Sequence, residues 1–219
     1  YEQENGKRIQ WHTLSVPRGG EYKLVLADGT RVWLNAASEL MYPDHFSADQ
    51  RKVVLKGEAY FEVTKDVKRP FSVVLGDMEV KVLGTSFNVS AYPGVKRQTT
   101  LIEGQVAVNW HRQQVVIRPG QQAAETDEGL RVASVNVMNY VGWKEHRFVY
   151  ENKLLGEVLE DLERWYDVEV FVMHDEIRNL HLTANLPKYE NMDKVLEIIE
   201  YAACVKFEVK GRTVVVRRD

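Results

Sequence analysis

Short runs in which apolar and polar residues alternate dominate the chain from about residue 21 to residue 135. A period of two is typical of β-strands that bury one face. Asp28-Gly29 separates two of these runs and predicts a hairpin, because glycine adopts positive φ without a Cβ clash. With no helical period beyond a turn near residues 43–49, this region predicts a β-rich domain of layered or solenoid-like form. The clearest runs are Lys23–Leu26, Arg31–Leu34, Ala59–Val63, Met78–Val82, Phe87–Ala91, Val106–Trp110 and Val115–Ile117.

After about Trp143 the spacing of apolar residues changes to the three- and four-residue steps of amphipathic helices. A strand pattern follows each helical stripe, Val168–Val172 after the first and Val205–Val209 after the second, and a Lys210-Gly211 turn leads to a final run, Thr213–Val216. This part of the chain therefore predicts an α+β domain. The first stripe contains Leu154, Leu155, Val158, Leu159, Leu162 and Trp165, and the second contains Met192, Val195, Leu196, Ile199 and Ala203.

The two helix-and-strand segments match one another at an offset of 37 residues. We interpret the match as a duplicated β-α-β unit, in which each helix covers a sheet that neither half could bury alone. The generic likeness of any two amphipathic helices followed by strands is the alternative. The aligned residues are Val158-Leu159-Glu160 with Val195-Leu196-Glu197, Leu162 with Ile199, Glu163 with Glu200 and Val168 with Val205.

The change of pattern divides the chain into a linker at 1–20, a β-rich domain at 21–140 and an α+β domain at 141–219. The longest uninterrupted apolar stretches have four or five residues, whereas a membrane-spanning helix needs about 20. These residues therefore predict a soluble segment. Because the chain starts at Tyr1 without a methionine, we expect an upstream part that would contain any membrane anchor or targeting signal.

Composition argues against several classes of function. The net charge of −3 and the pI near 6.1, with Lys and Arg interspersed among Asp and Glu, give no broad cationic face for nucleic acid. Cys204 is the only cysteine, so no intramolecular disulfide can form. Its place in the apolar run Ala202–Val205 predicts a thiol in the core rather than a nucleophile.

The pattern of polar residues predicts no catalytic residues, no cofactor and no metal. The sequence has no phosphate-binding glycine loop, nucleophile elbow, HExxH pattern or paired cysteines. His174 and His181 are the closest pair of histidines, but their spacing in a polar loop matches no known ligand pattern. The charged run Lys65–Arg69 predicts an exposed connection between strands. The strand period favours core positions over a sugar-binding platform for the aromatic residues Trp33, Tyr60, Phe61, Phe71 and Phe87.

Several ordered blocks of the chain resemble the ferric-citrate regulator (FecR-like) family of anti-sigma factors. Residues 24–38, LVLADGTRVWLNAAS, resemble the opening of the periplasmic sensor domain of that family. Further blocks of the sensor domain are Leu55–Val63, Arg69–Phe71, Val80–Val89, Leu101–Val106 and Pro119–Gln121. The final third resembles the small domain that usually follows, through Trp143-Lys144, Phe148, Arg164–Val168 and Tyr189–Asn191. Together the blocks cover most of the chain from about residue 18 to its end.

This resemblance implies a periplasmic segment of a single-pass inner-membrane protein. Family members have a cytoplasmic segment that binds an extracytoplasmic-function sigma factor, one membrane helix and a periplasmic region. The periplasmic region contacts the signalling domain of a TonB-dependent outer-membrane transducer, and cell-surface signalling thereby regulates transcription. We expect the sigma-binding segment and the inner-membrane helix to lie outside these residues. The resemblance also implies that the α+β domain is similar to the short amino-terminal domain of secretins and TonB-dependent transducers.

We expect the α+β domain to bind its partner at a sheet edge, to which the transducer adds a strand. The two candidate edges are the run Val168–Val172 and the neighbouring run Leu180–Thr183. A periplasmic carbohydrate- or ligand-binding module is the alternative function, and a hydrolase would need a catalytic set that the sequence does not show. The candidate partner-binding residues are Tyr166, Val168, Val170, Val172, Leu180 and Leu182.

Overall fold

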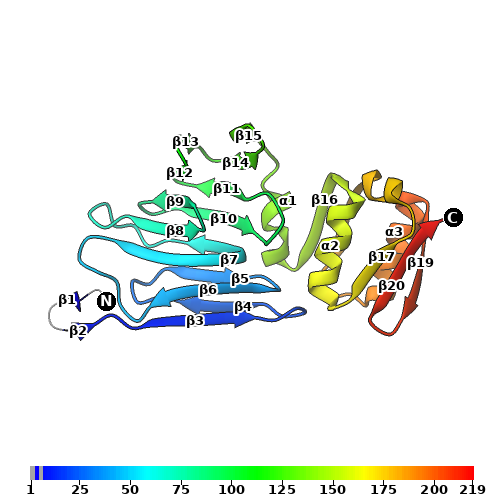
Figure 1. Cartoon of the computed structure of the whole chain (residues 1–219), viewed down its shortest axis with the longest axis horizontal. Helices are drawn as coiled ribbons and strands as arrows, with labels where there is room; N and C mark the ends of the chain where they lie inside the picture. The colour runs from blue at the N-terminus through cyan, green and yellow to red at the C-terminus, as the bar shows by residue number, and fades with distance from the viewer. Residues whose placement is uncertain (1–2, 5–6) are drawn as a thin grey trace. The chain divides into compact units, whose positions relative to one another are not determined.

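The computed structural model describes residues 3–4 and 7–219, which form two compact units (Figure 1). Unit 1 comprises residues 1–17 and 21–137, and unit 2 comprises residues 18–20 and 138–219. Unit 1 consists of strands and unit 2 combines strands with helices, as the two sequence patterns predict. Among the described residues no helix has the length and apolar character needed to cross a membrane.

Unit 1 is a network of strands in which the long strand β7 (Arg51–Glu62) is the branch point. One branch has the order β13-β12-β9-β8-β7-β6-β3, and the other has the order β4-β5-β7-β10-β11-β14-β15. Both branches contribute to one apolar core, so the unit is layered. The strands are β1 (Gln3–Glu4), β2 (Lys7–Arg8), β3 (Trp11–Val16), β4 (Tyr22–Val25), β5 (Arg31–Leu34), β6 (Ser38–Pro43), β8 (Phe71–Leu75), β9 (Met78–Val82), β10 (Ser86–Ala91), β11 (Gln98–Glu103), β12 (Val106–Trp110), β13 (Gln113–Ile117), β14 (Gln121–Thr126) and β15 (Gly129–Ser134).

Gly57 lies where β7 changes partners. Before it, β7 pairs with β6 and in parallel with β8, and from Gly57 onward it pairs with β10 and then β5. The backbone of Gly57 has φ of +91°, and a Cβ there would lie 2.7 Å from the Ser38 Cα. Only glycine allows this close approach, which lets one strand serve both branches of the network.

The alternation read from the sequence is confirmed in the core of unit 1. Phe61, Phe71 and Phe87 are fully buried, and the rings of Phe61 and Phe87 stack with centroids 5.2 Å apart. The predicted Asp28-Gly29 hairpin joins β4 to β5. The aromatic residues of these strands therefore contribute to packing, and they form no exposed platform at these three positions.

Residues 1–2 and 5–6 of the predicted linker at 1–20 lie outside the described residues, and a later part of it forms a strand. Trp11–Val16 form β3, which pairs antiparallel with β6 along its whole length. Of the six residues only Val16 is buried, while Leu14 is half-buried, so the alternation is too weak to identify a strand from sequence. The ladder with β6 stabilises the strand instead.

Unit 2 contains two β-α-β segments, as the 37-residue match predicts. The first is β16 (Arg147–Leu154), α2 (Leu155–Tyr166) and β17 (Glu169–Val172), and the second is β18 (His181–Pro187), α3 (Met192–Ala203) and β19 (Val205–Lys210). A final strand, β20 (Thr213–Arg218), pairs in parallel with β17 and antiparallel with β19. The remaining elements are the short helix α1 (Met138–Val141) and the 3-10 helices η1 (Gly142–Glu145) and η2 (Asp175–Asn179).

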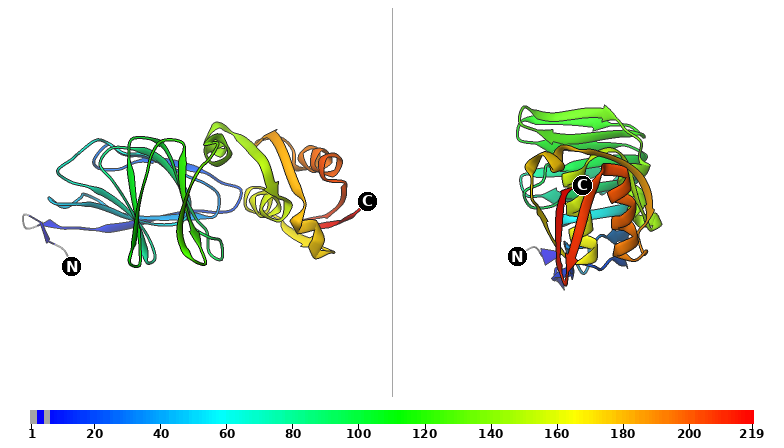
Figure 2. Two further views of the ribbon diagram at one scale, coloured as in Figure 1. Left: turned by 90° about the horizontal axis from the view of Figure 1, so that it is seen from above. Right: turned by 90° about the vertical axis from the view of Figure 1, so that its right-hand side faces the viewer.

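The strands of unit 2 form a two-stranded sheet, β16-β18, and a three-stranded sheet, β17-β20-β19. Both helices contact strands of both sheets and share one core with them (Figure 2). The apolar stripes confirm the sequence prediction, since Val158, Leu162 and Ile199 are among the buried side chains. Each helix thus covers two sheets at once, which explains why neither repeat could bury its apolar residues alone.

The two helices end in the same way. Asp167 after α2 and Cys204 after α3 adopt the left-handed conformation, with φ of 54° and 52°. Their N–H groups donate to the carbonyl oxygens of Glu163 and Glu200 respectively. The prediction of a core thiol was therefore wrong: Cys204 is exposed, because the left-handed turn ends the buried stripe of α3 before it.

Candidate partner-binding site

The candidate partner-binding side chains selected from the sequence point mainly into unit 2. Leu182 and Val168 are buried, and the other four are half-buried against the same core: Tyr166, Val170, Val172 and Leu180. The hydroxyl of Tyr166 donates a hydrogen bond to the Glu190 carbonyl at 2.9 Å. Because their side chains serve packing, any strand that adds at these positions would be bound by the backbone. The availability of backbone N–H and carbonyl groups at each sheet edge therefore decides where a partner strand could add.

The outer edge of β17 is occupied at its centre. The N–H of Glu169 donates to the carbonyl of Arg212, just before β20, and the N–H of Met173 donates to β20, so in this parallel pair the N–H of Val170 points away from the sheet. That N–H donates to the Glu163 Oε1 at 2.7 Å. Glu163 stands on the last turns of α2 and reaches around the edge of the strand. A partner strand could pair here only by displacing this carboxylate.

The outer edge of β19 is occupied in the same manner. The N–H of Phe207 donates to the Glu200 Oε1 at 2.6 Å, and Glu200 stands on α3. The second oxygen of Glu200 lies 3.5 Å from the Lys206 Nζ. Charged groups at an edge strand are a common protection against unwanted pairing. Both outer edges of the three-stranded sheet therefore carry a carboxylate from the helix of the same repeat.

The outer edge of β16 lies against the turn that precedes it. A Cβ on Gly142 of η1 would lie 2.7 Å from the Val149 Cγ2 and 3.4 Å from the carbonyl oxygen of Arg147. The short helices α1 and η1 both pack on β16. Only a residue without a side chain lets η1 approach so closely, and this approach covers the edge.

The outer edge of β18 differs from the other three. Lys188 N donates to His146 O, and Leu180 O accepts from Leu155 N, so alternate residues of β18 bond to β16. The intervening residues His181, Thr183 and Asn185 direct their N–H groups outward, and all three are exposed. Among the described residues no acceptor is found for these N–H groups. The carbonyl of Asn185 accepts from the Arg147 Nη2 at 3.2 Å.

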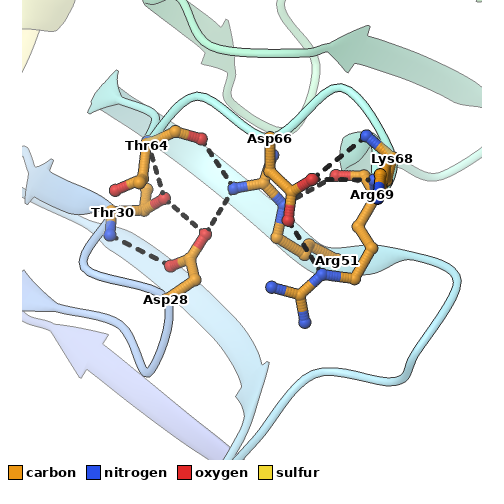
Figure 3. A network of polar contacts seen from close by, with 7 residues as sticks. All are labelled: Asp28, Thr30, Arg51, Thr64, Asp66, Lys68 and Arg69. Carbon is orange, nitrogen blue, oxygen red and sulfur yellow. Dashed lines mark hydrogen bonds and ion pairs between the residues drawn. The ribbon is translucent and has the colours of Figure 1, made fainter.

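A buried ion pair in unit 1 is a second polar feature (Figure 3). The side chains of Arg51 and Asp28 are 1% and 6% exposed, and Arg51 Nη1 lies 2.7 Å from Asp28 Oδ2. The guanidinium also donates to the carbonyl oxygens of Thr64 and Arg69, each at 2.8 Å. Asp28 in turn accepts from the N–H and hydroxyl of Thr30. The network thus holds the connection between the parallel strands β7 and β8 in place. The sequence predicts this connection only as an exposed charged run.

A third feature joins the ends of several hairpins in unit 1. Arg97 pairs with Glu125 through Nε at 2.7 Å and with Asp77 through Nη1. Trp110 Nε1 donates to the other Asp77 oxygen at 3.0 Å. The hydrogen bond from Arg97, followed by that from Trp110, lowers the pKa of Asp77 to about 2. Sequence reasoning missed this cluster because its members come from separate strands and turns.

Both clusters match each arginine with carboxylates or carbonyls. Arg51 is neutralised by one buried carboxylate, and Arg97 lies between two. Such matched pairs hold loops in place, and in the second cluster the bonds from Arg97 keep the pKa values of Asp77 and Glu125 low. We therefore assign these clusters to the stability of unit 1, and the edges of unit 2 are the better candidates for recognition.

Two parts of the chain match known protein families, and both families are described as FecR. Residues 12–107 match the family FecR protein, and residues 147–216 match the family FecR, C-terminal. The two matches fall in the β-rich part and in the α+β part of the chain. None of the curated proteins matches this sequence.

Comparison with solved structures gives matches over nearly the whole chain. Two crystal structures of a "putative anti-sigma factor" from Parabacteroides distasonis ATCC 8503, at 1.65 Å and 2.50 Å resolution, each match with a TM-score of 0.89 and 26% sequence identity. The first match covers 95% of this chain and 99% of the other, and the second covers 96% and 100%. The family matches and the structural matches therefore indicate the same kind of protein.

Proposed function

Because the chain belongs to the FecR-like family of anti-sigma factors, we propose that it is the periplasmic part of a membrane-anchored regulator of transcription. In this proposal it relays a signal from a TonB-dependent outer-membrane transducer to an extracytoplasmic-function sigma factor. The sigma factor would be bound by a cytoplasmic segment outside this chain, connected through an inner-membrane helix. The protein acts by binding partners rather than by catalysis, in keeping with the regulatory character of the family.

One observation favours unit 2 as the part that receives the signal. It has an exposed strand, β18, whose outward N–H groups have no acceptor among the described residues. Unpaired backbone groups on a strand edge are a ready template for a strand of another protein. In unit 1 the two charged clusters hold loops in place.

Binding of transducer signalling domains tests the proposal directly. The purified chain is immobilised and presented with the signalling domains of TonB-dependent transducers encoded near its gene. Selective binding of one domain supports the proposed role and identifies the pathway. If the folded chain, verified by circular dichroism, binds none of them, the proposed role is wrong.

The alternative of a carbohydrate- or ligand-binding module has less support. A sugar-binding platform would need exposed aromatic residues in the β-rich part, but Phe61, Phe71 and Phe87 are fully buried and Tyr60 is 6% exposed. Calorimetry with oligosaccharides separates the two functions, since a binding module would show saturable heat without a protein partner. We expect no such heat.

A further inference from the structure

We propose that the signalling domain adds an extended strand to the outer edge of β18. Glu163 and Glu200 favour this edge because they occupy both outer edges of the three-stranded sheet. The inference rests on the proposed function, because it names the surface that the transducer uses. It differs from the expectation drawn from sequence, in which β17 and β18 were equal candidates.

Glu163 and Glu200 are equivalent residues of the repeat, and each makes one edge of the three-stranded sheet less available to a partner strand. A carboxylate accepts a hydrogen bond more strongly than a neutral carbonyl does. The N–H groups of Val170 and Phe207, bound at 2.7 Å and 2.6 Å, are therefore poor sites for a carbonyl of an incoming strand. A strand that paired with β17 or β19 would lose this bond before making its own. The cost favours the β18 edge, where the N–H groups have no acceptor to displace among the described residues and only the Asn185 carbonyl would exchange a bond, the one from Arg147 Nη2.

The β18 edge offers three outward N–H groups at alternate positions. They belong to His181, Thr183 and Asn185, and the carbonyls of His181 and Thr183 have no donor among the described residues. Pro187 ends the strand and has no N–H, so pairing must stop there. This limits the partner to a short strand of about five residues, a usual length for an edge strand.

The neighbouring face of α3 suggests the chemistry of the incoming strand. The helix α3 packs against β18. Ile198 is 45% exposed, and Tyr201, one turn further along, is 91% exposed. An added strand with apolar side chains at alternate positions would cover them.

Two proline variants test the edge. His181→Pro and Asn185→Pro remove an outward N–H but leave the bonds between β18 and β16 in place, whereas proline at Leu182 would break that ladder. The matched controls His181→Ala and Asn185→Ala keep the outward N–H, and Asn185→Ala shares with its proline variant the loss of the bond from Arg147 Nε to Asn185 Oδ1. We expect each proline variant to bind the signalling domain about tenfold more weakly than its alanine control, as the loss of a main-chain hydrogen bond and the added ring predict.

Hydrogen exchange supplies a second readout that does not depend on substitutions. In the free chain the amides of Val170 and Phe207 should exchange slowly, and those of His181, Thr183 and Asn185 rapidly. Binding of the domain should slow exchange at the three β18 amides. Unchanged exchange there, or proline variants that bind as tightly as their alanine controls, overturns the β18 assignment while the proposed function stands. If the wild-type chain binds no domain, both are overturned.

Discussion

Glu163 and Glu200 make the same contact in the two repeats, each accepting a hydrogen bond through Oε1 from the backbone N–H seven residues later. The partners are Val170 and Phe207, on the two outer strands of the three-stranded sheet. Duplication of a β-α-β segment would otherwise leave two open edges. The helix that covers each strand also provides the group that closes its edge.

Removing either carboxylate should destabilise unit 2 and expose an edge. Glu163→Ala and Glu200→Ala leave a backbone N–H without its charged acceptor, which costs about 1–2 kcal/mol for a partly exposed bond. Urea unfolding measures the loss, and sedimentation detects self-association through the opened edge. Glu157→Ala and Glu197→Ala, exposed on the same helices, are the controls and should change neither property. Equal effects from all four variants would contradict this assignment.

Breaking the buried Arg51–Asp28 pair should destabilise unit 1 more than any exposed pair does. Arg51→Met leaves the Asp28 carboxylate buried without its cation, a change that typically costs about 3–5 kcal/mol. Asp28→Asn gives a second test with the arginine retained. Arg31→Met, which removes an exposed pair with Glu62, should cost less than about 1 kcal/mol. Denaturant unfolding compares them, and similar losses for Arg51→Met and Arg31→Met would refute the role of burial.

Substitution of Gly57 should be among the most damaging changes in unit 1. Gly57→Ala places a Cβ 2.7 Å from the Ser38 Cα at a φ of +91°, so both strain and overlap oppose folding. We expect a loss of about 3 kcal/mol or more. Gly94→Ala is the matched control, because its φ is +79° but nothing lies within 4 Å of the added Cβ. A loss no larger than that of Gly94→Ala would show that β7 tolerates the overlap.

Acid should weaken unit 1 partly through Asp77. Its pKa is lowered from 3.8 to about 2, first by the hydrogen bond from Arg97. A lowered pKa means that the contribution of this carboxylate to stability is complete above pH 3.8 and is lost as the pH falls through about 2. Between pH 4.5 and 2 the urea midpoint of Asp77→Asn should therefore fall less than that of the wild type. Asp127→Asn, at a side chain that is 92% exposed, should follow the wild type.

Tyr166 should remain protonated to a higher pH than an exposed tyrosine does. Burial, with a smaller effect of Glu190, raises its pKa from 10 to about 12. Its contribution to stability is therefore complete below pH 10 and is lost as the pH rises through about 12. Tyr166→Phe should remove a step near pH 12 from the tyrosinate absorbance of the chain, and cost about 1 kcal/mol through the lost bond to Glu190 O. Tyr201→Phe, at a position 91% exposed, should cost nothing measurable.

Local patterns in the sequence were sufficient for the class of fold and for the elements with a strong apolar period, but not for β3. The period of two around Phe61 and Phe87 and the stripes of α2 and α3 both record which side chains become buried, and burial follows from periodicity within one element. The repeat at 37 residues already aligned Glu163 with Glu200. A glutamate at the same position beside each of the two apolar stripes was the signal in the sequence that could have indicated the edge contacts.

Only the tertiary structure decided which strand edges are open. The sequence selected Val170 and Leu182 by their apolar character, which marks them for the core and says nothing of the backbone groups beside them. Edge accessibility depends on which segments meet: Glu163 on β17, Gly142 on β16, and no acceptor found for the outward N–H groups of β18 among the described residues. These encounters join residues distant along the chain, so periodicity within one segment determines the strands, and packing between segments determines the edge left for a partner.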